Sequence, residues 1–268
     1  MAEKKVRFII ERQDGPGEKP YNQEFDVDYR PGLNVVAALM EIQKNPVTVD
    51  GKRVPPVNFE CNCLEKVCGA CMMVINGQSR QACCALVDDL KQPIHLQPSR
   101  TFPVIRDLLI DRSIMFENLK KIQGWIEIDG SWDVKDAPIQ NPYTAQLAYH
   151  LSRCFTCGNC LHACPNVDYS YLPVKDLEDK GGAGKSPGAA DFMGAQPIAQ
   201  AYLFNLNPLG SFDKPKRLNV LMEKGGITSC GNSQNCAKAC PQNLPLLDVL
   251  AQVNRDVNVQ ALKNMFNF

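Results

Sequence analysis

The spacing of its cysteines constrains this chain more than any other feature. Thirteen cysteines fall into three groups, at 61–84, 154–164 and 230–240. The second group has the spacing C-x2-C-x2-C-x3-C-P, and the third has the same spacing with Ser233 in place of its second cysteine. This spacing is typical of bacterial ferredoxins, in which the fourth cysteine of each run binds the other run's cluster. One missing thiolate therefore predicts one 4Fe–4S cluster and one 3Fe–4S cluster.

The exchange of fourth cysteines predicts two ligand sets. The expected 4Fe–4S ligands are Cys154, Cys157, Cys160 and Cys240. The expected 3Fe–4S ligands are Cys164, Cys230 and Cys236. Thiolate is the normal cluster ligand, so we expect Ser233 to bind no iron. A second complete cluster, with the serine as a ligand, is the alternative.

The first cysteine group has a different spacing. Three of its six cysteines follow C-x4-C-x2-C, which matches the plant-type 2Fe–2S loop, and the fourth ligand comes from a cysteine pair farther along the chain. These residues are Cys63, Cys68 and Cys71, followed by Cys83 or Cys84. Cys63 is preferred to Cys61 because only Cys63 gives the x4 spacing. A zinc site with four cysteine ligands is the alternative, although such sites usually consist of paired C-x2-C segments.

The composition narrows the class of protein. Of the 268 residues, 44% are hydrophobic and 22% are charged, as in a soluble globular protein. Basic and acidic residues number 29 each, which gives no indication of a nucleic-acid partner. No apolar stretch is long enough for a bilayer span, and we expect no signal peptide. Cysteines in a chain without a secretory signal favour metal binding over disulfides.

The N-terminal pattern predicts a small α+β domain over residues 1–115. A turn at Asn76-Gly77 predicts a hairpin that begins with Met72–Ile75. Asn34 is the expected N-cap of a helix over Val35–Lys44. Further strands are expected at Lys5–Arg12, Gln23–Tyr29 and Ile94–Gln97. Together these elements predict a plant-type 2Fe–2S ferredoxin-like fold of the β-grasp type.

The second half predicts an all-α, bacterial-ferredoxin-like domain over 143–268, after a linker at 116–142. Apolar residues at helical spacing predict a helix within Val104–Ile122. Further helices are expected at Ala145–Ser152, Ala189–Phe204, Leu218–Lys224 and Leu246–Lys263. Pro197 is expected to break or kink the second of these. The glycine-rich stretch 181–186 is interpreted as a surface loop, because the phosphate-loop frame requires glycine where Asp179 stands.

No catalytic residues are expected in this chain. It shows no Ser–His–Asp arrangement, dinucleotide-binding glycine motif or paired acidic motif. His162 lies inside the second cysteine run. It is either an ordinary polar residue or a hydrogen-bond partner that tunes a nearby cluster.

A 2Fe–2S loop followed by a 4Fe–4S and 3Fe–4S pair resembles the iron–sulfur subunits of succinate dehydrogenase and fumarate reductase. The segments that carry the resemblance are 63–83, 154–165 and 230–246. The resemblance implies that the fourth 2Fe–2S ligand is Cys83, which leaves two cysteines over. We expect these, Cys61 and Cys84, to be spare buried thiols. The departures from the family loop are mild: they are Lys66 for glycine, Ala70 for serine and Gln81 for leucine.

The resemblance implies an electron-transfer subunit of succinate:quinone oxidoreductase, in the tricarboxylic acid cycle and the respiratory chain. Electrons would pass from FAD on a flavoprotein subunit through the 2Fe–2S, 4Fe–4S and 3Fe–4S clusters to a quinone. The quinone would bind at a membrane anchor that holds haem b. The expected location is peripheral, on the cytoplasmic side of the bacterial cell membrane. The alternatives are the same role in a fumarate reductase running in reverse, and a subunit of another flavin dehydrogenase.

The quinone side chains of ubiquinone-type relatives are absent here. Those relatives have serine and tryptophan after the second run's proline, and histidine after the third run's first cysteine. This chain has Asn166, Tyr169 and Gly231 at these positions. The resemblance therefore implies a menaquinone-linked enzyme with a diheme anchor, and a quinone site that includes Pro165 and Tyr169.

Overall fold

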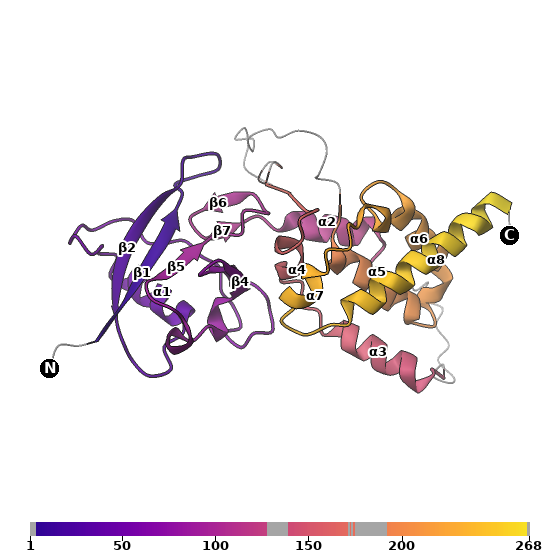
Figure 1. Ribbon diagram of the computed structural model, residues 1–268, viewed down its shortest axis with the longest axis horizontal. Coiled ribbons are helices and arrows are strands. Elements are labelled where there is room, and N and C mark those ends of the chain that lie inside the picture. Colours follow the sequence, from indigo (N-terminus) through magenta and orange to yellow (C-terminus); the bar gives the residue numbers. More distant parts are fainter. Residues whose placement is uncertain (1–3, 128–138, 171, 173, 175–191, 267–268) are drawn as a thin grey trace. The chain divides into compact units, whose positions relative to one another are not determined.

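The computed structural model shows two compact units (Figure 1). The described residues are 4–127, 139–170, 172, 174 and 192–266. The first unit contains Met1–Arg112, Phe155–His162 and Tyr169–Ser186, and the second contains Ser113–Cys154, Ala163–Asp168 and Pro187–Phe268. Every named strand belongs to the first unit and most helices belong to the second. The expected α+β class is confirmed.

A five-stranded sheet forms the centre of the first unit, in the order β2-β1-β5-β3-β4 (Figure 1). β1 (Lys5–Arg12) pairs antiparallel with β2 (Tyr21–Asp28) along its whole length, and parallel with β5 (Ile94–Gln97). Every second residue of β1 is buried, because successive side chains of a strand point to opposite faces. The strands expected for β1 and β5 are confirmed, and β2 begins at Tyr21 instead of Gln23.

One helix, α1 (Val35–Lys44), packs on this sheet and has the expected bounds. The side chain of Asn34 caps it by accepting a hydrogen bond from the N–H of Ala37 at 2.8 Å, which satisfies one of the free donors at a helix start. The helix contributes five residues to the core of the unit: Val35, Val36, Ala38, Leu39 and Ile42. Each fully buried aliphatic side chain of this kind stabilises the fold by about 1.5–3 kcal/mol.

The hairpin expected at Asn76-Gly77 is confirmed and brings two cysteines together. β3 (Met72–Ile75) pairs antiparallel with β4 (Gln78–Gln81). The φ angles of Asn76 and Gly77 are +49° and +79°, the two positive values that a type I′ turn requires. A short 3-10 turn, η1 (Ala82–Cys84), follows β4, and a second, η2 (Val87–Asp89), lies just beyond it. The hairpin therefore returns the chain from Cys71 to the neighbourhood of Cys83.

The helix expected within Val104–Ile122 is wrong for the first part of that range. The elements observed there are β6 (Val104–Arg106), β7 (Leu109–Ile110) and α2 (Ser113–Lys121). Asp107, in the β6–β7 turn, has a φ of +50° and is fully buried. Its carboxylate accepts hydrogen bonds from the Arg12 guanidinium at 2.7 Å and 3.1 Å. A contact with β1 thus stabilises a turn where local periodicity favoured a helix.

Helices form the described part of the second unit. They are α2, α3 (Pro142–Ser152), α5 (Ala195–Leu206), α6 (Lys214–Met222), α7 (Asn235–Ala239) and α8 (Leu246–Phe266), with 3-10 turns η3 (Gly210–Asp213) and η4 (Ile227–Ser229). α5 packs against α3 and α8, and α8 also packs against α6. Within the described residues, no helix is long and apolar enough to cross a membrane.

Two helices begin earlier than the sequence predicted. α3 begins at Pro142 instead of Ala145, because Asn141 accepts a hydrogen bond from a first-turn N–H and proline is favourable at the first helical position. α6 begins at Lys214 instead of Leu218. The helix expected at Leu246 is confirmed and extends to Phe266.

The break or kink predicted at Pro197 is wrong. α5 begins at Ala195 instead of Ala189, so Pro197 lies in the first turn. The N–H groups of a first turn have no partner within their helix, so a missing one costs no helical hydrogen bond there. The loop expected at 181–186 and residues 128–138 of the expected linker lie outside the described residues, and the linker's first residues, 116–121, belong to α2.

Candidate iron–sulfur sites

The first cysteine group lies on a loop that bends sharply. Three of its residues have positive φ angles, at +60°, +60° and +73°: Leu64, Lys66 and Gly69. These bends point backbone N–H groups at sulfur. The N–H groups of Glu65 and Val67 both donate to Sγ of Cys63 at 3.4 Å, and that of Ala70 donates to Sγ of Cys68 at 3.4 Å. Such donors stabilise thiolate charge.

The expected 2Fe–2S ligands form two pairs in the first unit. The Cys68 thiol lowers the pKa of Cys63 and the Cys83 thiol raises that of Cys71, so the four thiols lie close together in two pairs. The N–H of Cys83 also donates to Sγ of Cys71 at 3.5 Å. Across the described residues, no three histidine, cysteine or acidic side chains converge on a single metal ion. Two pairs of thiols match the needs of a two-iron cluster, with one pair for each iron.

The two sides of this loop differ in their electrostatics. Hydrogen bonds from the N–H groups of Glu65 and Val67, and then from the Cys68 thiol, lower the pKa of Cys63 to about 7. Burial raises the pKa of Cys71 to about 12. Cys63 is therefore partly thiolate at neutral pH, and Cys71 remains a thiol until iron displaces its proton.

The two spare cysteines have different environments. Cys61 is partly buried against the core of the first unit, near Cys68 and Cys83. Cys84 is exposed, and its thiol lies 3.3 Å from the carbonyl oxygen of Gln81. The prediction of two buried spare thiols is therefore wrong for Cys84.

The second cysteine run is divided between the two units. Cys157 and Cys160 belong to the first unit, whereas Cys154 and Cys240 belong to the second. Because these four cysteines belong to two different units, the 4Fe–4S ligand set stays a prediction. Cys160 lies on the short helix α4 (Asn159–His162) of the first unit.

His162, at the end of α4, is held by two hydroxyl groups. Its Nδ1 lies 2.8 Å from Oγ of Ser99 and 3.3 Å from Oγ1 of Thr101. Burial lowers the pKa of this imidazole, so it is neutral at physiological pH. The contacts anchor the second cysteine run to the end of the ferredoxin-like sheet. Its role in tuning a cluster stays a prediction.

Two close contacts near the first loop had no signal in the sequence. A Cβ atom built on Gly69 would lie 2.8 Å from Cα of Cys157 and 2.9 Å from its Cβ. The carbonyl oxygen of Gly69 accepts a hydrogen bond from Nη1 of Arg112 at 3.0 Å. Spacing and periodicity report local geometry, so neither could predict contacts between segments this far apart.

Three expected 3Fe–4S ligands line one small cavity in the second unit. They are Cys164, Cys230 and Cys236. Ser233 lines the same cavity, between α7 and the start of the third run, with the apolar side chains of Phe192 and Leu250. Burial raises the pKa values of Cys164 and Cys236, and the neighbouring thiols raise them further. The donor set of this cavity is thus three thiols and the hydroxyl of Ser233, and Ser233 itself is exposed.

Of the three positions that replace the usual quinone side chains, Asn166 and Gly231 are in contact with each other, and Tyr169 belongs to the other unit. The Asn166 side chain donates to the carbonyl oxygen of Ser229 at 2.9 Å, and a Cβ on Gly231 would lie 2.9 Å from its amide nitrogen. Tyr169 is buried, with its ring centroid 6.1 Å from that of Phe102. Pro165 is exposed. Pro165 and Tyr169 belong to different units, so a quinone site containing both stays a prediction.

Comparisons with known proteins agree with this arrangement. The family model of the 2Fe–2S iron–sulfur cluster binding domain matches residues 7–117. The succinate dehydrogenase iron–sulfur subunit of Bacillus subtilis (strain 168) is 50% identical over 267 residues, which cover 99% of this chain and 98% of that protein. This chain belongs to the family of succinate dehydrogenase and fumarate reductase iron–sulfur subunits.

More distant members of this iron–sulfur subunit family cover most of the chain as well. The fumarate reductase iron–sulfur subunit of Wolinella succinogenes is 27% identical over 240 residues, covering 88% of this chain and 90% of that protein. A solved structure of the Mycobacterium smegmatis Sdh1 complex in the apo form contains a chain with a TM-score of 0.73 and 21% identity. The match covers 96% of each chain and shows that the fold extends over both halves.

Proposed function

We propose that this chain is the electron-transfer subunit of a succinate:quinone oxidoreductase. It relays electrons from the FAD of a flavoprotein subunit towards a quinone at a haem b membrane anchor, and it has no substrate site of its own. The observation that carries the proposal is the pairing of the thiols of Cys63 with Cys68 and of Cys71 with Cys83, within a family whose members are subunits of succinate-oxidising and fumarate-reducing enzymes. When bound, iron–sulfur clusters accept and donate single electrons.

The proposed ligand sets follow the sequence prediction. The 2Fe–2S set is Cys63, Cys68, Cys71 and Cys83. The 4Fe–4S set is Cys154, Cys157, Cys160 and Cys240. The 3Fe–4S set is Cys164, Cys230 and Cys236. The two thiol pairs support the first set and the cavity shared with Ser233 supports the third, while the second rests on spacing alone.

The proposed organisation is a 2Fe–2S domain over 1–115, a linker over 116–142 and a two-cluster domain over 143–268. The chain is peripheral, held on the cytoplasmic side of the bacterial membrane by its anchor subunit. Asn166 and Gly231 occupy positions that bind ubiquinone in other members, which supports menaquinone and a diheme anchor. The site would include Pro165 and Tyr169. Fumarate reduction by the same relay is the alternative direction, favoured by the Wolinella relative.

Low-temperature EPR of the purified complex tests the proposed relay. We expect a 3Fe–4S signal in the oxidised sample, a 2Fe–2S signal after succinate is added and a further signal after dithionite. A second 4Fe–4S signal without a 3Fe–4S signal would contradict the proposed role of Ser233. A complex without visible absorbance would contradict the iron–sulfur function altogether.

The two adjacent cysteines provide a matched pair of variants for the 2Fe–2S site. Cys83→Ser is expected to remove or strongly alter the 2Fe–2S signal, and Cys84→Ser is expected to leave it unchanged. The reverse result would move the fourth ligand to Cys84. Haem quantification tests the anchor: one haem or none per complex would contradict the diheme proposal.

A further inference from the structure

The loop of proposed 2Fe–2S ligands touches the second cysteine run through the backbone of Gly69. Gly69 lies between Cys68 and Cys71, and it packs directly on Cys157, which is a proposed 4Fe–4S ligand. A Cβ at position 69 would lie 2.8 Å from Cα of Cys157 and 3.0 Å from the ring of Phe155. Cβ atoms do not approach other carbon atoms this closely. Glycine is therefore the residue that lets these two segments meet.

Arg112 holds this loop in place. Its Nη1 donates to the carbonyl oxygen of Gly69 at 3.0 Å, and its Nη2 donates to Oε2 of Glu60 at 2.8 Å. The Arg112 side chain is only 15% exposed, whereas that of Glu60 is 46% exposed. A guanidinium group presents its donors in a rigid plane, so these two contacts define the position of the carbonyl group. Glu60 forms an ion pair with Arg112 on the solvent-exposed side of this guanidinium group.

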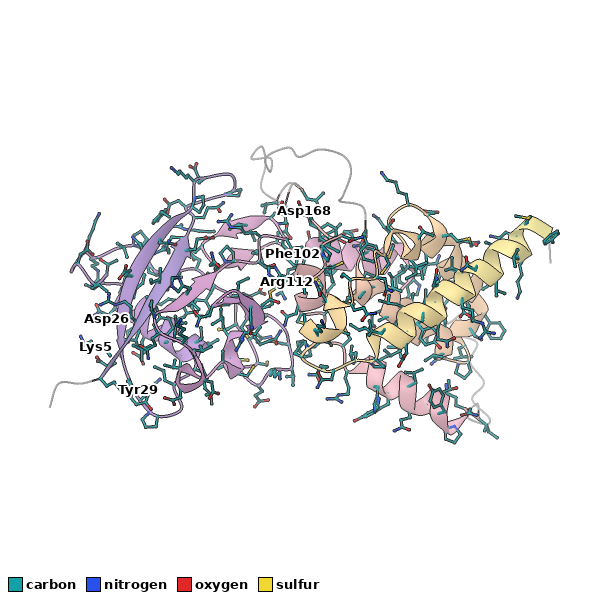
Figure 2. All side chains as sticks on the ribbon, viewed as in Figure 1. Lys5, Asp26, Tyr29, Phe102, Arg112 and Asp168 are labelled. Atoms are coloured by element: carbon teal, nitrogen blue, oxygen red, sulfur yellow. The ribbon has the colours of Figure 1, made fainter. Side chains whose placement is uncertain are left out.

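The support for Arg112 is itself rigid. Arg112 follows β7, and the β6–β7 turn is held by the buried pair of Asp107 and Arg12. Figure 2 labels Arg112 and Phe102, both in the first unit, and the ring of Phe102 lies 3.2 Å from a Cβ built on Gly158. The loop and residues 155–162 of the second cysteine run thus belong to the first unit and pack on the same framework.

We propose that Arg112 is a positioning residue for electron transfer between the 2Fe–2S and 4Fe–4S clusters, because it keeps Gly69 in contact with Cys157. The inference rests on the proposed function. When bound, the two clusters would exchange a single electron, with no change in any bond or proton. The hydrogen bonds of Arg112 go to Gly69 and Glu60, and neither residue is a proposed cluster ligand. Arg112 acts through the Gly69 carbonyl group.

The charge of Arg112 adds a second effect. A positive group close to the 2Fe–2S loop stabilises the reduced cluster, which carries one more negative charge than the oxidised cluster. Removing this charge is therefore expected to lower the midpoint potential. Arg112→Lys separates the two effects, because it keeps the charge but loses the two-point, planar contact.

The test uses the purified complex with Arg112→Gln, Arg112→Lys and Gly69→Ala variants. Arg30→Gln is the matched control, because Arg30 lies in the same unit, is 59% exposed and has only a 3.7 Å ion pair with Glu41. Three quantities are measured. They are the EPR midpoint potential of the 2Fe–2S cluster, its spin-relaxation enhancement by the 4Fe–4S cluster in dithionite-reduced samples, and the freeze-quench rate at which succinate removes the 3Fe–4S signal.

Arg112→Gln is expected to lower the midpoint potential, weaken the relaxation enhancement and slow the succinate reaction severalfold. Arg112→Lys is expected to restore the potential but not the full relaxation enhancement. Gly69→Ala is expected to weaken the enhancement most, and if that variant fails to assemble, the Arg112 variants still decide.

Arg112→Gln behaving like Arg30→Gln would overturn the inference. A changed midpoint potential in Arg112→Gln with an unchanged spin-relaxation enhancement would also overturn it, because Arg112 would then act only through its charge. A wild-type complex without the three cluster signals would instead contradict the proposed function, so the two failures are distinguishable.

Discussion

Replacing Asp107 with asparagine tests whether the buried ion pair defines the β6–β7 turn. The Asp107 carboxylate accepts five hydrogen bonds, two from Arg12, one from the Gln13 N–H and two from Asn58, at 2.7–3.3 Å. Arg12 and Asp107 are 1% and 0% exposed. Both carboxylate oxygens accept hydrogen bonds, so an asparagine at this position would point its NH2 group at N–H donors whichever way its amide is turned. The substitution also leaves the Arg12 charge buried without a counter-ion. Breaking one side of such a pair costs about 3–5 kcal/mol.

Native-state hydrogen exchange of the β1 amides measures this loss. At about 1.4 kcal/mol per factor of ten, the expected cost corresponds to exchange that is faster by about two to three and a half orders of magnitude. The amides of β1 report the opening of the whole sheet, because β1 pairs with strands on both sides.

Asp26→Asn is the matched control for this prediction. Asp26 also pairs with an arginine on β1, Arg7 at 2.6 Å, but these side chains are 27% and 39% exposed. Exposed ion pairs contribute about 0–1 kcal/mol, so exchange is expected to change by less than about tenfold. Equal exchange rates in the two variants would refute the claim that the buried ion pair of Arg12 and Asp107 stabilises the β6–β7 turn.

Three further predictions concern the cysteine sites. Gly231→Ala is expected to displace the Asn166 amide and to lower the free energy of unfolding by about 1 kcal/mol through its lost hydrogen bond; in an Asn166→Ala background the same change is expected to cost less in urea denaturation. After chelation of iron, Cys63 is expected to be alkylated with a half-maximal rate near pH 7, and Cys71 to remain unreactive until far higher pH; equal pH profiles by mass spectrometry would contradict this. Because a lowered thiol pKa stabilises the folded state above that pKa, this stabilisation of the iron-free loop is lost as pH falls from about 9 to about 7. Ser233→Cys is expected to replace the 3Fe–4S EPR signal with that of a second 4Fe–4S cluster, and retention of the 3Fe–4S signal would show that the cavity, not the missing thiolate, limits the iron count.

The sequence by itself determined the elements whose causes are local. The Asn34 cap and the Asn76-Gly77 turn depend on neighbouring residues, and both are confirmed. The alternation along β1 follows from the geometry of one strand, and the structure shows it. The cysteine spacing is also a local feature, because three thiols within one loop can reach one cluster only through local backbone bends. These sequence patterns are sufficient to indicate the family without the three-dimensional structure.

Only the tertiary structure decided the features that join distant segments. The stretch after Val104 has helical periodicity, yet Arg12 stabilises a buried turn at Asp107 because an unpaired buried charge would be costly. Gly69 is a common loop residue in the sequence, and only the packing of Cys157 against it shows why a side chain is excluded. Arg112 belongs to no motif: the role proposed for it rests on one carbonyl oxygen, that of Gly69, which long-range folding brings within 3.0 Å of its guanidinium group.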